Sequence, residues 1–185
     1  MKNGFASIHG QTIKTSSFGV TDQSYDLTFD ILEGKFPKYK INSNPYNKKG
    51  RVEGELVGGN LALIYALLGT NYSFKFKDKI LFIEDIGENF YALDRMLMSL
   101  DLAGVFRKIK GLIVGGMTNM GDEKDNKNFG ESFDEFAYKI ISERISKYNF
   151  PTIFGFPNGH IHDNRPLLIG GTVKMEVEEK VKVEF

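Results

Sequence analysis

The sequence predicts an α/β domain with mixed sheets. Two short apolar runs, residues 80–83 and 112–114, are typical of strands buried on both faces, and a helical pattern follows each of them. The chain then ends in three short β-like segments, at 166–169, 172–177 and 180–185. Strands and helices thus mix in the middle of the chain and strands dominate its end, which favours this class.

Weaker patterns fill the first half of the chain. In order they are a strand at 5–10, an ambiguous segment at 21–33 that fits a helix capped by Thr21 or Asp22, an extended piece at 39–41, a turn-rich stretch at 42–50, a strand at 51–57 and a helix at 61–68. The strand at 51–57 alternates polar and apolar residues, which indicates half burial. Asn60 suits the N-cap of the next helix, because its side-chain oxygen can accept from free backbone N–H groups.

The second half contains two well-marked helices. The first follows Gly87, carries Phe90, Leu93, Leu97 and Leu100 at helical spacing, and ends at Gly104. Gly115-Gly116 is expected to stop the second buried strand, and 117–130 reads as a polar surface loop. Ser132 and Glu135 form a capping box for the second helix, and a short strand at 151–155 comes next.

Composition narrows the class of protein. One domain is expected for 185 residues, and 24 basic residues balance 24 acidic ones, which argues against a nucleic-acid partner. Cysteine is absent, so disulfides and thiol nucleophiles are excluded. No apolar run is long enough for a membrane span, and the first residues do not resemble a signal peptide. A cytoplasmic protein without a membrane partner is the simplest interpretation.

Glu84 is the first candidate site residue. It directly follows the buried run at 80–83, and α/β folds place their sites at such strand ends. Partial burial would distinguish this carboxylate from an ordinary surface charge. The alternative is that Glu84 or Asp85 merely caps the helix that starts near Glu88.

His160 is the second candidate. It lies in a Pro157-Asn158-Gly159-His160 turn just past a strand, and imidazole is the common general base near neutral pH. A carboxylate that accepts from its other ring nitrogen would fix the tautomer and stabilise the imidazolium. The alternative is a loop histidine that hydrogen-bonds the local backbone.

A metal site near His160 is an alternative. His160, His162 and Asp163, with an oxygen from Glu84 or Glu88, would suit zinc or iron, although no helical histidine pair supports this. The interpretation of His160 as the base of a catalytic triad, oriented by a carboxylate, is therefore preferred. Neither a metal nor another cofactor is expected.

Gly58-Gly59-Asn60 precedes a helix and could place a substrate carboxylate, because small residues and a helix N-terminus expose backbone N–H groups. A purely structural turn is the alternative.

A nucleophile is harder to find. Gly130-Glu131-Ser132 superficially resembles a nucleophile elbow, but an elbow serine follows a buried strand, whereas Ser132 follows a charged loop. Ser7 is no better supported. No serine of this chain stands in a convincing nucleophile context.

Five segments, taken together, resemble the serine LD-carboxypeptidase family. They are Gly-Glu-Leu-Val-Gly-Gly-Asn-Leu at 54–61, Leu-Leu-Gly-Thr at 67–70, Ile-Leu-Phe-Ile-Glu-Asp-Ile-Gly-Glu at 80–88, Asp-Arg-Met-Leu at 94–97 and Gly-His at 159–160. The family includes murein tetrapeptide LD-carboxypeptidases and microcin-immunity peptidases. The segments occur in the family's order and at compatible spacings.

The resemblance implies a metal-free Ser-Glu-His triad in which Glu84 and His160 are the acid and the base. It also implies release of the terminal D-alanine from an L,D-linked murein tetrapeptide during cytoplasmic peptidoglycan recycling. The fold implied is a swivelling β/β/α-type C-terminal domain. His9-Gly10-Gln11 stands where the family usually has His-Gly-Pro.

The family serine belongs to an N-terminal domain that this chain lacks. We therefore expect residues 1–185 to be the C-terminal domain, with residues 1–50 including the connection from the nucleophile domain. The isolated chain should be inactive, and the surface that the other domain would cover favours a homodimer. The alternative is a non-catalytic remnant, or a module that binds murein peptide or a partner chain.

Overall fold

The computed structural model describes residues 5–12, 20–121 and 135–185 of the chain. Its helices are α1 (Asp22–Leu32), α2 (Leu61–Leu67), α3 (Phe90–Leu102), α4 (Val105–Lys108) and α5 (Glu135–Arg144). Its strands are β1 (Ser7–His9), β2 (Lys38–Asn42), β3 (Gly50–Asn60), β4 (Ile80–Ile86), β5 (Gly111–Thr118), β6 (Thr152–Phe154), β7 (Leu167–Ile169), β8 (Thr172–Val177) and β9 (Lys180–Glu184).

Within these residues, seven strands form one sheet in the order β2-β9-β8-β3-β4-β5-β6, and β1 pairs with β7 in a two-stranded sheet. The four strands β3 to β6 are parallel. By contrast, β8 is antiparallel to β3, and β9 is antiparallel to both β8 and β2. Parallel neighbours need crossover connections, which α2, α3 and α5 supply here. The predicted α/β class with mixed sheets is confirmed.

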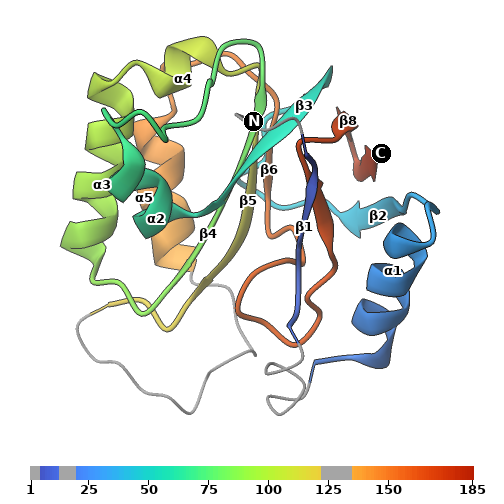
Figure 1. Ribbon diagram of the computed structural model, residues 1–185. Coiled ribbons are helices and arrows are strands. Elements are labelled where there is room, and N and C mark those ends of the chain that lie inside the picture. The colour runs from blue at the N-terminus through green and yellow to red at the C-terminus, as the bar shows by residue number, and fades with distance from the viewer. Residues whose placement is uncertain (1–4, 13–19, 122–134) are drawn as a thin grey trace.

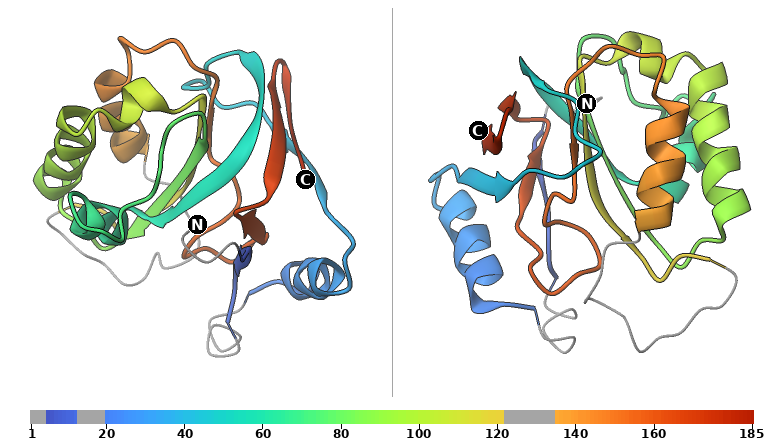
Figure 2. Two further views of the ribbon diagram at one scale, coloured as in Figure 1. Left: turned by 45° about the horizontal axis from the view of Figure 1, so that its top comes forward. Right: turned by 180° about the vertical axis from the view of Figure 1, so that it is seen from behind.

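The parallel strands form the middle layer of the molecule. Figure 1 shows α2, α3 and α5 together on one side of β4 and β5, with β1, β2 and α1 on the other, and the view from behind in Figure 2 agrees. Leu81 and Ile83 pack into the core beneath the helices, whereas Ile80 and Phe82 pack into the core shared with β7, β8 and β9. Both faces of β4 are therefore buried, as its continuous apolar run predicted.

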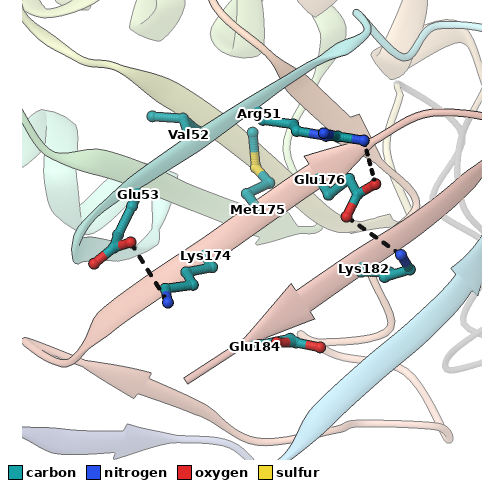
Figure 3. A pocket seen from close by; sticks show the side chains of 8 residues that line it. All are labelled: Arg51, Val52, Glu53, Lys174, Met175, Glu176, Lys182 and Glu184. Carbon is teal, nitrogen blue, oxygen red and sulfur yellow. Dashed lines mark hydrogen bonds and ion pairs between the residues drawn. The ribbon is translucent and has the colours of Figure 1, made fainter.

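The antiparallel strands expose one face, which carries ion pairs between strands. Figure 3 shows Glu176 between two cations: Arg51 Nη2 lies 2.9 Å from its Oε1 and Lys182 Nζ lies 3.3 Å from its Oε2. Lys174 and Glu53 lie 3.8 Å apart on the same surface. These charges pair with one another across β3, β8 and β9, so this face is a solvated surface of the sheet.

Three strands run further than the sequence analysis expected. β3 includes Gly58-Gly59-Asn60, β4 continues through Glu84-Asp85, and β5 continues through Gly115-Gly116. Gly115-Gly116 was expected to end β5, but the absence of a side chain at Gly115 instead allows neighbouring groups to pack closely against the strand. A Cβ there would lie 2.5 Å from the carbonyl oxygen of Asn158 and 2.9 Å from the Phe82 ring. The corrected strands bring more polar residues to the carboxyl edge of the sheet.

Helix ends were predicted more accurately. Thr21 accepts from the backbone N–H of Ser24, so the ambiguous segment at 21–33 is a capped helix. Asn60 accepts from the backbone N–H of Leu63 at 3.1 Å and is the N-cap of α2, as predicted. Ser132 and its capping box lie outside the described residues, as does the loop beyond Gly121. The short helix α4, which follows Gly104, was not predicted.

No helix in the described part of the chain is long and apolar enough to cross a membrane.

Replacing Gly58 with alanine should destabilise the fold strongly. Gly58 pairs with Phe82 across the parallel β3–β4 ladder at a φ of 138°, and a Cβ there would lie 1.9 Å from the Phe82 carbonyl oxygen. We expect Gly58→Ala to lower the free energy of unfolding by about 3 kcal/mol or more, measured by urea unfolding with circular dichroism.

Gly69→Ala is the matched control. Gly69 also has a positive φ, 74°, but no atom lies within 4 Å of its would-be Cβ. Its cost should be only the backbone strain of about 1–2 kcal/mol. Equal losses in the two variants would show that the contact with Phe82 is not what requires glycine at position 58.

Candidate active site

The candidate residues come together at the carboxyl edge of the parallel strands. Asn60 and Glu84 are register partners at the ends of β3 and β4, and His160 lies in the loop after β6. Because the carboxyl ends of parallel strands share one edge, segments that are distant in the sequence meet there. Glu84 is 1% exposed, which confirms the burial expected of it.

The loop that carries His160 is held by two buried asparagines. Asn158 Nδ2 donates to the carbonyl oxygens of His9 at 2.9 Å and Arg165 at 2.7 Å, and Asn164 Oδ1 accepts from the backbone N–H of Gly159 at 3.1 Å. Gly159 has a φ of 124°, and a Cβ there would lie 3.1 Å from Glu84 Oε2. Glycine at this position lets the loop approach the carboxylate closely.

Glu84 and His160 form a direct hydrogen-bonded pair. Nδ1 of His160 lies 2.9 Å from Oε2 of Glu84. This hydrogen bond raises the pKa of His160, burial opposes the shift, and the charges of Glu84 and Asp85 add to it. With Nδ1 engaged by the carboxylate, Nε2 is the ring nitrogen positioned for proton exchange with a reactant.

A second imidazole, which the sequence analysis did not select, lies beside the same carboxylate. His9 Nε2 is 3.7 Å from Glu84 Oε1, and the His9 ring packs edge-on against Phe82 with 5.3 Å between centroids. Burial lowers the pKa of His9, although the Glu84 carboxylate opposes this shift. The sequence signals were a histidine at the end of a short strand and its place in the His9-Gly10-Gln11 segment, but its position beside Glu84 depends on contacts between distant segments.

Asp85 has a structural role beside the pair. Its carboxylate accepts from Asn60 Nδ2 at 2.8 Å and from the backbone N–H groups of Ala62 and Ile86 at 3.0 and 2.9 Å. Burial raises the pKa of Asp85 to about 6. Asp85 therefore connects the start of α2 to β4. The side-chain amide of Asn60 donates to Asp85, and its side-chain oxygen caps α2.

The predicted anion site is not a loop. Gly58 and Gly59 are part of β3, where Gly58 passes against Phe82 and Gly59 lies under His9, with a would-be Cβ 3.6 Å from His9 Nδ1. Close approach to Phe82 accounts for Gly58, and a positive φ of 142° favours glycine at position 59. Asn60 remains at the edge next to Glu84, and the role of these three residues in substrate binding stays a prediction.

A cavity of about 160 Å³ opens beside the pair. His9, Glu84, Gly159, His160 and His162 are among the residues that line it. Typical small-molecule sites have volumes of roughly 300–1,000 Å³. The cavity is therefore smaller than a site that would enclose a peptide.

The alternative metal site has little geometric support. Asp163 is engaged by Arg165, with Nε and Nη2 of the guanidinium 2.9 Å from its two carboxylate oxygens. Within residues 5–12, 20–121 and 135–185, no group of three or more histidine, aspartate or glutamate side chains is arranged to hold a metal ion.

The fold and the site together define an α/β domain that presents a hydrogen-bonded carboxylate–imidazole pair at the carboxyl edge of its parallel strands. Residues 53–175 match the family model of the LD-carboxypeptidase C-terminal domain, and the chain belongs to that family.

Known relatives agree with this membership. A probable murein peptide carboxypeptidase of Bacillus subtilis is 31% identical over 185 residues, which cover 97% of this chain and 56% of that protein. A murein tetrapeptide carboxypeptidase of Pseudomonas aeruginosa is 30% identical over 69% of this chain and 39% of its own length. The crystal structure of muramoyltetrapeptide carboxypeptidase from Oxalobacter formigenes superposes with a TM-score of 0.83 at 27% identity, covering 99% of this chain and 62% of that one. The chain thus spans about half the length of the curated relatives it matches.

Glu84→Gln should lower the pKa of His160. The hydrogen bond that His160 donates to the carboxylate is the largest cause of its raised pKa, whereas the burial that lowers the pKa would remain. We expect the pKa of His160 to fall below its wild-type value, measured by the pH titration of its Cε1–H resonance in NMR spectra. Glu55→Gln is the control, because Glu55 pairs with Lys79 and is not among the groups that shift the pKa of His160. A titration of His160 that is unchanged in Glu84→Gln would contradict the electrostatic pairing.

Proposed function

We propose that this chain is the C-terminal domain of a serine-type LD-carboxypeptidase that releases the terminal D-alanine from an L,D-linked murein tetrapeptide. The observation that carries the proposal is the 2.9 Å contact between the buried carboxylate of Glu84 and Nδ1 of His160. The similarity to a probable murein peptide carboxypeptidase and to a murein tetrapeptide carboxypeptidase supports the substrate class. The cytoplasmic location, the place in peptidoglycan recycling and the homodimer stay predictions.

Glu84 and His160 have complementary roles in the proposed reaction. Glu84 accepts from Nδ1–H, which leaves Nε2 to take the proton of a serine hydroxyl as that oxygen attacks the peptide carbonyl carbon. The imidazolium is stabilised by the carboxylate and then gives its proton to the leaving amine of D-alanine. Water repeats the sequence on the acyl-enzyme, and the proton passes back to the serine oxygen. No metal takes part in these steps.

The nucleophile comes, in this proposal, from an N-terminal domain. The family model that matches is that of a C-terminal domain, and the chain spans 56% of the Bacillus relative. We place residues 1–185 in the acid–base domain, and residues 1–50 include the connection to the nucleophile domain. Backbone N–H groups next to that serine would stabilise the oxyanion.

The size of the cavity fits a site shared between two domains. At about 160 Å³ it is smaller than a typical ligand pocket, and the side chain of His160 is 43% exposed. A second domain over this surface would complete the pocket and exclude water from the reaction. Gly58, Gly59 and Asn60 at the neighbouring strand end would then help to place the substrate.

The proposal predicts activity by complementation. The chain alone should release no D-alanine from a murein tetrapeptide, and mixing it with a separately produced nucleophile domain of a relative should restore release. Removal of a triad member lowers the rate by several orders of magnitude in known serine peptidases. We therefore expect His160→Ala to abolish activity in the mixture, measured by a coupled assay for D-alanine.

His162→Ala is the matched control, because His162 lines the same cavity. It should leave most of the activity. Full activity of His160→Ala would remove His160 from the mechanism, and inhibition of hydrolysis by a chelator would revive the metal alternative. Binding of tetrapeptide without hydrolysis in an assembled mixture would favour the non-catalytic module.

The pH dependence follows from the raised pKa of His160. The base must be neutral to accept the serine proton, so kcat/KM should be high above the pKa of His160 and fall as the pH drops through it. Because the hydrogen bond to Glu84 raises that pKa from 6.5, the acid limb should lie above pH 6.5 in an assembled enzyme in which Glu84 remains the dominant influence. If Glu84→Gln leaves the position of the acid limb unchanged, that limb reports the ionisation of a group other than His160.

A further inference from the structure

Two imidazoles approach the same buried carboxylate from different sides. Oε2 of Glu84 is 2.9 Å from His160 Nδ1, and Oε1 is 3.7 Å from His9 Nε2. At 3.7 Å the second contact is electrostatic rather than a hydrogen bond. Each oxygen of the carboxylate therefore has its own imidazole neighbour.

His9 is held in this place by contacts to three other segments. Its strand β1 pairs with β7, with His9 opposite Leu167. Its carbonyl oxygen accepts from Asn158 Nδ2, two residues before His160, and its ring packs on Phe82, two residues before Glu84. Gly59 lies beside the ring, with its would-be Cβ 3.6 Å from His9 Nδ1. The same segments that carry Glu84 and His160 thus fix the position of His9.

The surroundings give the two rings opposite protonation tendencies. Burial lowers the pKa of His9 and the neighbouring His160 lowers it further, while Glu84 opposes the shift. The hydrogen bond to Glu84 raises the pKa of His160, with further contributions from the charges of Glu84 and Asp85. Within the described residues, the charged groups that shift the pKa of His9 are Glu84 and His160, and those that shift the pKa of His160 are Glu84 and Asp85. Over an interval of pH, His160 carries a proton and His9 does not.

We propose that His9 is a positioning residue for the acid–base pair: its neutral ring directs Nε2–H at Oε1 of Glu84 and keeps Oε2 aimed at His160 Nδ1. The carboxylate beside Nε2 favours the tautomer with its proton on that nitrogen. The N–H dipole of a neutral ring orients the carboxylate without neutralising it, so the full negative charge remains to stabilise the His160 imidazolium. The importance of this arrangement for catalysis rests on the proposed function.

The arrangement also links the two titrations. When His9 takes up a proton at low pH, it becomes a cation that competes with His160 for one carboxylate, and the two imidazolium charges repel each other. A purely structural histidine would show no such link to the protonation of His160.

NMR titration of the chain itself tests the proposal. In the wild type, the Cε1–H resonance of His160 should show its own titration and a smaller inflection at lower pH, where His9 takes up a proton. His9→Phe keeps an aromatic ring against Phe82 but has no donor, so it should lose the smaller inflection and lower the pKa of His160 by about half a unit or more. His9→Gln retains an N–H donor, so it should lose the inflection and keep the pKa of His160 close to the wild-type value.

His162→Gln is the matched control and should leave the titration of His160 unchanged. The proposal is overturned if His9→Phe leaves the titration of His160 as in the wild type, or if His162→Gln changes it as much as His9→Phe does. Should His9→Phe fail to fold, the outcome rests on His9→Gln, in which persistence of the lower inflection would overturn the coupling.

The two proposals can fail separately. The titration needs no nucleophile, substrate or second domain, so a negative complementation result would leave the coupling of His9, Glu84 and His160 intact. Conversely, the absence of coupling would leave the roles of Glu84 and His160 in hydrolysis standing.

Discussion

The carboxyl edge of this domain is organised around a carboxylate that is almost fully removed from water. An ionised group in such a place is costly unless partners replace its hydration. Glu84 has such partners in His160 at 2.9 Å and His9 at 3.7 Å, which come from opposite ends of the sequence. The long-range packing of β1 and of the loop after β6 against β4 is therefore what makes the burial of Glu84 tolerable.

Glycines provide the room for this packing. Gly159 lies against the side chain of Glu84, where a Cβ would come within 3.1 Å of Oε2. Gly58 lets β3 approach the Phe82 backbone, and Gly115 lets β5 approach the Asn158 carbonyl in the loop after β6, within distances that a Cβ would forbid. The site is thus assembled by close contact between backbones, and its geometry depends on residues that have no chemistry of their own.

The sequence predicted those features that depend on local pattern. The apolar runs of β4 and β5, the periodic face of α3 and the caps Thr21 and Asn60 were all correct, because each follows from a few neighbouring residues. The ends of β3, β4 and β5 were wrong, since glycines and acidic residues were interpreted as strand stops, whereas pairing with neighbouring strands decides where a strand ends. Glu84 and His160 were selected from their places after strands and from family motifs. His9 was missed because its relation to Glu84 arises only when β1 packs beside β4.

The electrostatics of the pair bear on why the site would be divided between two domains. His160 is 43% exposed, and the hydrogen bond to Glu84 is the largest influence on its pKa, which it raises. A domain that covered this surface would remove water from the ring, and desolvation disfavours the imidazolium. Docking would then oppose the effect of Glu84 and lower the pKa of His160. A larger fraction of the ring would be neutral and able to accept a proton from serine. In the proposed enzyme, the second domain would therefore adjust the basicity of His160 in addition to supplying the nucleophile.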